Sequence, residues 1–266
     1  MCDGELVYYL YCLTPSAREL HVSAIGVDGR HPIFARGCGG IGAVLSEVER
    51  GEFCGDAAEA RLEDLEWLGP RVCRHEAAIE EVMRQTPVLP ARFATLFTSI
   101  DALEQSVLER LDAIGGFFAQ LGDKQEWAVK GLLSRTDALK PPGSSGRLAG
   151  EAQTGTQYFE EKRIKAHWER DLTFRLKEFR RRAATALSAH AEGFRERKVL
   201  DSVTAGTDVE TVLSWAFLLP PGALDEFRGR LESFNGGEAL PGLKLTLTGP
   251  WPPHSFVPNL SLVEKI

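Results

Sequence analysis

Short runs of β-favouring residues alternate along this chain with longer segments in which apolar residues recur every three or four positions. The strand-like runs lie at 6–13, 22–27, 41–48, 88–97, 126–133, 211–219 and 243–248. The segments with a helical period lie at 56–68, 72–84, 100–120, 156–192 and 224–234. Strands and helices that interleave at such short lengths predict an α+β fold, in which a sheet carries helices on one face.

The composition of these runs indicates how each is buried. Leu6–Leu13 is continuously apolar and rich in tyrosine, which predicts a strand covered on both faces. Leu243–Thr248 alternates apolar and polar residues, so one face of that strand should be polar. Gly69-Pro70 is expected to end the helix that begins near Asp56, because proline lacks the amide proton that a helix interior needs.

A length of 266 residues favours two domains, at roughly 100 to 200 residues per domain. We expect an N-terminal α+β domain at 1–98 and a C-terminal domain at 99–266. The second domain would contain a long helix at about 156–195, whose periodic part spans on the order of 55 Å. Prolines, glycines and serines at 137–156 predict a flexible loop before that helix.

Charge is distributed unevenly along the chain. The formal net charge is −7, and the pI is near 5.5. Residues 46–81 hold eleven acids against four arginines, whereas residues 160–198 hold twelve bases against seven acids. This polarity suits self-association or an oppositely charged protein partner, although both segments are also typical of solvated helix faces. The acidic pI and the lack of a known reader motif argue against nucleic-acid binding.

The sequence also bears on location. No run approaches the roughly 18 apolar residues of a membrane-spanning helix, and the first residues are acidic where a signal peptide would be basic. The five cysteines are irregularly spaced and include no C-x-x-C pair. We therefore expect a cytoplasmic protein with reduced thiols and without a disulfide framework or a zinc site.

A glycine-rich stretch provides the strongest signal for an enzyme. Gly37–Gly42 has the G-x-G-x-x-G spacing of a dinucleotide loop, and acids follow about twenty residues later at Glu63 and Asp64. Such a loop should lead into a helix, yet residues 43–48 are strand-like. A nucleotide-dependent enzyme, or a ligand-binding module that uses this loop, therefore remains the alternative function.

Other catalytic patterns are incomplete. His75-Glu76 begins the zinc motif H-E-x-x-H, but Ile79 stands where the second histidine should lie. The sequence contains neither a G-x-S-x-G elbow nor a G-x-x-x-x-G-K-[ST] phosphate loop. We expect no catalytic residue, no metal and no cofactor.

Two segments are unusual as sequences. Residues 89–97 carry a single charge, Arg92, within an apolar run, which predicts that a carboxylate or backbone carbonyls hold the guanidinium. Residues 248–257 place three prolines around Trp251. This stiff apolar segment would either clamp the C-terminal domain or offer an aromatic binding edge.

Four segments together resemble the gas vesicle accessory family GvpF/GvpL. They are Val7–Tyr11, Leu89–Phe97, Glu126–Lys130 and Thr248–Val257, in the order that the family shows. The family pattern has glycine at the position of Ala94 and tyrosine at the position of His254. The histidine could add pH sensitivity to its segment.

The resemblance implies a non-enzymatic protein that helps to assemble gas vesicles, which provide buoyancy inside cells. It implies a ferredoxin-like N-terminal domain, an α/β C-terminal domain with a long helix, and a location in the cytoplasm and on the gas vesicle. The expected partners are the major shell protein and other accessory proteins, with self-association possible and no nucleic acid or membrane bound. Candidate structural or partner-contact residues are Arg92, Phe93, Trp127, Lys130, Pro250, Trp251, Pro252, Pro253 and Phe256.

Overall fold

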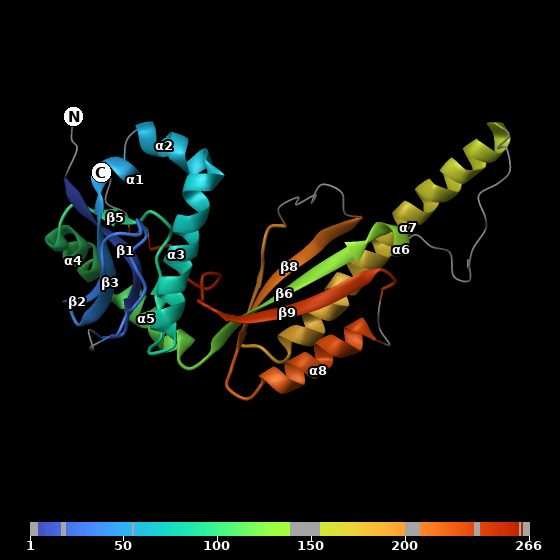
Figure 1. The fold of residues 1–266 in the computed structure, drawn as a ribbon. Helices are drawn as coiled ribbons and strands as arrows, with labels where there is room; N and C mark the ends of the chain where they lie inside the picture. Colours follow the sequence, from blue (N-terminus) through green and yellow to red (C-terminus); the bar gives the residue numbers. More distant parts are fainter. Residues whose placement is uncertain are drawn as a thin grey trace. The chain divides into compact units, whose positions relative to one another are not determined.

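The computed structural model describes residues 5–16, 20–54, 56–138, 155–199, 208–236, 240–260 and 262, and for 56–57, 59–60 and 155–168 it describes the backbone alone. The chain forms two compact units (Figure 1). Unit 1 comprises residues 1–125 and 251–266, and unit 2 comprises residues 126–250. The C-terminal segment thus returns to the unit that contains the N-terminal half.

Unit 1 is built on an antiparallel sheet. Its strands are β1 (Leu6–Thr14), β2 (Ile33–Cys38), β3 (Ile41–Glu49), β4 (Leu89–Pro90) and β5 (Leu96–Phe97). The strand order is β2-β3-β1-β4, and β5 also pairs with β1. Residues Tyr9 to Leu13 of β1 are all fully buried, which confirms the expectation of a strand covered on both faces.

Helices lie on both sides of this sheet, so the expectation of helices on one face was wrong for unit 1 (Figure 1). They are α1 (Arg50–Phe53), α2 (Asp56–Glu63), α3 (Leu65–Met83), α4 (Ile100–Leu108) and α5 (Leu111–Leu121). Ile79 and Val82 of α3 share a hydrophobic cluster with Tyr9, Tyr11 and Val44 of the sheet. Helix α4 contacts β2 and β5, and α5 contacts β4. Since α4 and α5 belong to this unit, its compact part extends beyond residue 98, where the sequence suggested a boundary.

Unit 2 has its own sheet and core. Its elements are β6 (Gln125–Ser134), α6 (Arg135–Ala138), α7 (Gly155–Ser188), β7 (Gly193–Glu196), β8 (Val209–Leu219), α8 (Leu224–Asn235) and β9 (Leu243–Trp251). The strand order is β7-β8-β6-β9. Phe179 of α7 and Phe227 of α8 join Trp215 and Leu245 of the strands in one cluster, so both helices cover the same face. The described helices include none that is long and apolar enough to cross a bilayer.

The two units repeat one arrangement. In each, the first strand of the unit lies between its third and fourth, and the second lies at the edge beside the third. Unit 2 has the full strand-helix-strand-strand-helix-strand succession of a ferredoxin-like fold. In unit 1, α3 supplies the second crossover, while the described residues between β1 and β2 contain no helix. The mixed α+β class with two sheets is confirmed.

Several local expectations were wrong. Residues 22–27 form only an isolated bridge between Ile25 and Pro32, and the true second strand is β2. The turn at Gly39 and Gly40, both with positive φ, folds 33–38 back onto β3 and so sets its pairing. The short strand β7 was not expected at all.

The sequence also misplaced boundaries of helices and strands. Pro70 does not end a helix: α3 begins after the N-cap Asp64, whose side chain accepts a hydrogen bond from the Glu66 amide, and continues to Met83. Only the bond from residue 70 to the Glu66 carbonyl is lost, so packing of the later turns outweighs it. Conversely, the segment 100–120 is two helices, α4 and α5, and 88–97 is two short strands around a turn. The loop expected at 137–156 falls largely outside the described residues.

Candidate functional site

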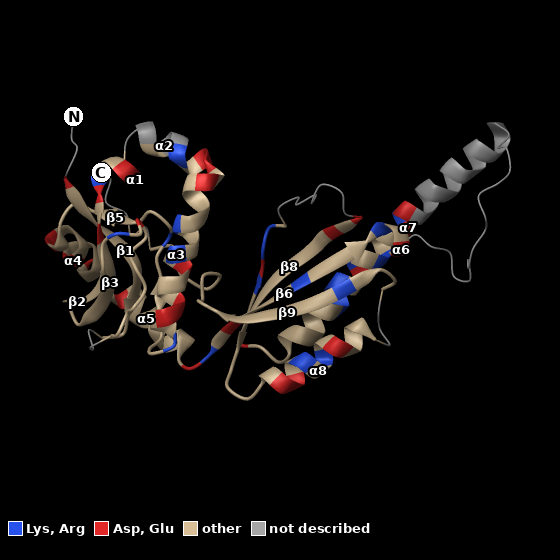
Figure 2. Cartoon of the chain, in the orientation of Figure 1, with Lys and Arg blue, Asp and Glu red and all other residues tan. Residues whose placement is uncertain are grey.

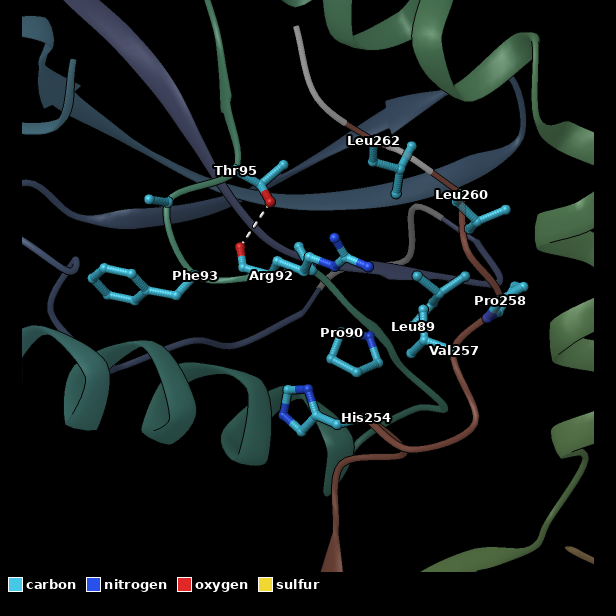
Figure 3. Close-up of a pocket in the computed structure, with 12 residues that line it drawn as sticks. Leu89, Pro90, Arg92, Phe93, Thr95, His254, Val257, Pro258, Leu260 and Leu262 are labelled. Carbon is cyan, nitrogen blue, oxygen red and sulfur yellow. Dashed lines mark hydrogen bonds between the residues drawn. The ribbon is translucent and has the colours of Figure 1, made fainter. Parts of the chain in front are cut away.

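Two segments that are far apart in sequence line one pocket in unit 1 (Figure 3). Residues 89–95 form one side, and His254, Val257, Pro258, Leu260 and Leu262 form the other. The pocket has a volume of about 290 Å³. These are the segments around Arg92 and after Trp251 that the sequence singled out separately.

The Arg92 segment forms a tight turn. The Arg92 carbonyl accepts hydrogen bonds from the Thr95 amide at 3.2 Å and from the Thr95 hydroxyl at 2.7 Å. Ala94 has a φ of 60°, a left-handed conformation that favours glycine. The backbone therefore keeps the positive φ even though alanine stands where the family pattern has glycine.

Buried polar side chains of β1 and α3 hold this turn through hydrogen bonds. The Tyr9 hydroxyl accepts a hydrogen bond from the Ala94 amide at 3.1 Å and lies 2.9 Å from Nδ1 of His75. Nε2 of the same histidine lies 3.3 Å from the carbonyl of Ala91. A neutral His75 with its proton on Nε2 satisfies every contact: Tyr9 donates to Nδ1, and Nε2 donates to Ala91. Strand β1 and helix α3 thus fix both sides of the turn.

Burial determines the protonation of this network. His75 is 1% exposed, and desolvation lowers the pKa of its imidazole to about 4. Burial also raises the pKa of the Tyr9 hydroxyl far above its usual value. The Tyr11 ring stacks on His75 at 5.7 Å, and the Phe93 ring meets His75 edge-on at the same centroid distance. The histidine is therefore a neutral structural group rather than a metal ligand.

The opposite side of the pocket is bonded to helix α3 and to the turn between α4 and α5. Pro252 and Pro253 are buried. His254 Nε2 lies 3.0 Å from Glu76 Oε2 on α3, and Arg110 Nε donates to the Leu260 carbonyl at 2.6 Å. Burial raises the pKa of Glu76, but the hydrogen bond and charge of His254 outweigh it, and the pKa is lowered overall.

Arg92 supplies the charge of the pocket. Its side chain is exposed and runs into the pocket toward Leu260 and Leu262, whereas Phe93 points away into the aromatic cluster (Figure 3). The sequence predicted a carboxylate or carbonyl partner for this guanidinium. No such partner is found within the described part of the chain, so the expectation is not met there.

The family segment Glu126–Lys130 meets the start of the Thr248–Val257 segment in unit 2, whereas Val7–Tyr11 belongs to β1 of unit 1. Trp127 is 8% exposed, and a Cβ added at Gly249 would lie 3.0 Å from Cε3 of its indole. Glu126 is 1% exposed and forms an ion pair with Arg197. Lys130 is exposed, and its carbonyl accepts a hydrogen bond from Thr246 at 3.3 Å. Trp127 is therefore a core residue, and within Glu126–Lys130 only Lys130 is exposed.

The Trp-Pro-Pro segment differs in exposure from residue to residue. Pro250 is exposed, Trp251 is 41% exposed, and Phe256 is partly buried. Figure 2 shows acidic and basic residues interspersed on the described helices of both units.

Sequence reasoning missed Tyr9 and Leu260 as parts of the site. The tyrosine-rich β1 run was a signal for the first, and nothing in the sequence marks the second.

The glycine-rich stretch is not a nucleotide loop. Gly37 pairs with Gly42, and Cys38 with Ile41, across the hairpin that joins β2 to β3. A strand rather than a helix follows, so this stretch offers no helix N-terminus to a pyrophosphate. No group of three or more His, Cys, Asp or Glu side chains suited to a metal occurs among the described residues.

Comparison with known proteins identifies the family. A family model described as gas vesicle synthesis protein GvpL/GvpF matches residues 7–258. The chain belongs to this family. Gas vesicle protein L of Streptomyces sp. (strain CB03234) is 30% identical over 254 residues, which cover 95% of this chain and 93% of the relative. Gas vesicle protein L1 of Halobacterium salinarum is 24% identical, over 95% and 90% of the two chains.

Solved structures agree on the fold. The crystal structure of GvpF from Anabaena sp. PCC7120 matches with a TM-score of 0.70 at 18% identity, covering 95% of this chain and 96% of that one. GvpF from Microcystis aeruginosa matches with a TM-score of 0.64, also at 18% identity, over 95% and 99% of the two chains. The two-unit fold is thus the fold of the GvpF structures. The family match gives the chain a gas vesicle-related role.

Proposed function

We propose that this chain is a non-enzymatic assembly protein that binds the major gas vesicle shell protein and other accessory proteins while the vesicle forms. It would act in the cytoplasm and on the gas vesicle, where it could remain as a minor component. The observation that carries this proposal is the family match over residues 7–258, nearly the whole chain.

The surface of the chain is compatible with such a role. Arg92 reaches a pocket without an ion-pair partner within the described residues, and Trp251 exposes 41% of its surface. Arginine and tryptophan are the residue types most often found at the energetic centre of protein interfaces. Lys130 adds an accessible cation on unit 2. These residues are the proposed contacts, whereas Phe93 and Trp127 would support them from within the cores.

Co-purification tests the proposal directly. The chain would be immobilised through a tag and mixed with the major shell protein, with an unrelated acidic protein of similar size as the control. Retention of the shell protein above the control is expected. Equal retention on both would contradict the proposed partner.

The exposed tryptophan gives a matched pair of variants. Trp251→Ala should weaken retention, whereas replacement of the exposed Phe174 on helix α7, outside the proposed contacts, should not. Equal effects of both substitutions would argue that exposed aromatics act nonspecifically. Because Trp251 is about half buried, its truncation should lower the free energy of unfolding by about 2 kcal/mol, below the cost of a core tryptophan.

A further inference from the structure

The Arg92 pocket combines a cation with apolar walls, and its described lining contains no acid. None of the twelve side chains that line it is Asp or Glu. Leu89, Val257, Leu260 and Leu262 provide aliphatic surface beside the guanidinium. A guanidinium carries five N–H donors and normally faces carboxylates or carbonyls, so this one is available to a ligand.

The turn that presents Arg92 is organised before any ligand binds. The Ala91 carbonyl and the Ala94 amide are each held by the buried pair of His75 and Tyr9. On the opposite side, Arg110 holds the Leu260 carbonyl at 2.6 Å. A pocket whose two sides are fixed in this way loses little conformational entropy on binding. The arrangement therefore suits recognition of a specific group.

We propose that this pocket binds a peptide segment of a partner protein in which an acidic side chain lies next to an aliphatic one. The acid would accept hydrogen bonds from Arg92, and the aliphatic side chain would contact Leu89, Val257 and Leu260. The inference deepens the proposed function, because it assigns the partner contact to one pocket and one ligand chemistry.

The size of the pocket favours this occupant, and the local charge of Arg92 has to supply the attraction. A volume of about 290 Å³ lies near the lower limit of small-ligand pockets, which span roughly 300 to 1,000 Å³, and it accommodates a pair of side chains better than a long acyl chain. The chain as a whole carries a net charge of −7, so an anionic ligand gains nothing from long-range attraction. Binding must come from the local guanidinium and should weaken as salt screens that contact.

Blocked tetrapeptides provide the test with the full-length chain. Acetyl-Gly-Glu-Leu-Gly-amide would be titrated by NMR or calorimetry beside the peptides with Gln for Glu and with Gly for Leu. We expect a dissociation constant of about 0.1 to 1 mM for the first peptide and at least tenfold weaker binding of the Gln peptide. Equal binding of the Glu and Gln peptides, or no binding of either at about 5 mM, would overturn the proposal.

Matched arginine variants locate the contact. Arg92→Gln should abolish the discrimination between the Glu and Gln peptides, while Arg36→Gln, at an exposed position of β2 in the same unit, should preserve it. If Arg92→Gln discriminates as the unchanged protein does, the pocket is not the site. Should Arg92→Gln fail to fold, Val257→Trp, which fills the pocket from a partly exposed position, must remove binding instead.

Two further measurements complete the test. The first distinguishes a peptide ligand from a small carboxylate, and the second separates failure of the pocket proposal from failure of the proposed partner. Hexanoate offers the same carboxylate and aliphatic chemistry without a peptide, and binding of hexanoate but not of the peptide would overturn the inference. The shell protein would be co-purified with the chain and with Arg92→Gln in parallel. If Arg92→Gln retains as much shell protein as the unchanged chain, the pocket is not the contact with the shell protein, but the proposed function stands. Peptide binding without shell-protein retention would keep the pocket and refute that partner.

Discussion

At the scale of single residues, the buried histidine of unit 1 links packing to protonation. His75 lies among Tyr9, Tyr11 and Phe93, and its two ring nitrogens are both engaged. If both nitrogens carried protons, Nδ1 could no longer accept the Tyr9 hydroxyl proton, and an uncompensated charge would be buried. The network therefore requires the neutral imidazole.

We predict that this histidine makes the protein less stable in mild acid. Its pKa falls from 6.5 to about 4 on folding, so between these pH values the unfolded chain binds a proton that the folded chain does not. The free energy of unfolding that the neutral histidine contributes is fully present above pH 6.5 and is lost as the pH falls toward 4. The loss amounts to about 3 kcal/mol in total. Denaturant melts at several pH values would measure it.

The control for this prediction is a substitution series. His75→Gln can still accept from Tyr9 and donate to Ala91, so it should flatten the stability profile between pH 6 and pH 4. His21→Gln, at an exposed position where only backbone groups form hydrogen bonds, should leave the profile unchanged. A profile for His75→Gln as steep as that of the unchanged chain would refute the assignment.

A second residue-scale prediction concerns Gly249 in unit 2. Its φ is 141°, and a Cβ there would lie 3.0 Å from the Trp127 ring and 3.1 Å from the Glu126 carbonyl. Gly249→Ala should therefore lower the free energy of unfolding by about 2 to 4 kcal/mol, from backbone strain and overpacking together. Gly115→Ala, in helix α5 with open space around it, should instead stabilise by about 1 kcal/mol. Thermal melts of both variants would test this contrast.

At the scale of elements, sequence patterns located most strands and helices but not the turns that depend on distant partners. The turn at 92–95 is fixed by Tyr9 and His75, and alanine rather than glycine occupies its positive-φ position. Composition gave no sign of such a turn, so 88–97 resembled a single strand. In the same way, pairing with β3 rather than β-propensity decides that 33–38 becomes a strand.

The long helix α3 provides the element-scale prediction. Pro70 lies within it and is exposed, and it removes the hydrogen bond that residue 70 would donate to Glu66. Pro70→Ala should restore that bond and raise the free energy of unfolding by about 1 to 3 kcal/mol. Pro221→Ala, at an exposed turn outside the helices, is the control and should not stabilise. Equal effects of the two substitutions in denaturant melts would contradict the helical explanation.

At the scale of the whole molecule, two units of related topology are joined so that the C-terminal segment completes the first. The sequence indicated Arg92 and the Trp-Pro-Pro segment as separate features, through their unusual composition and then through the family resemblance. That residues 89–95 line one pocket with residues from His254 onward, such as Val257 and Leu260, could not be predicted, because it depends on the chain returning to unit 1 after all of unit 2. The repeated strand order was also hidden, since β7 has only four residues and too weak a pattern to be recognised.

The last prediction concerns the C-terminal segment, which returns to unit 1. Pro252, Pro253 and Leu262 are buried, and this segment is bonded to Glu76 of α3 and to Arg110, which lies between α4 and α5. A chain that ends after Pro250 should therefore lose stability in unit 1, by about 2 to 5 kcal/mol from the lost apolar burial and hydrogen bonds. The core of unit 2 draws its residues from 127–245 and should remain intact. Hydrogen exchange would resolve the two outcomes: faster exchange in β1 and α3 with protected β6 and β8 is expected, and equal loss of protection in both units would contradict separate cores.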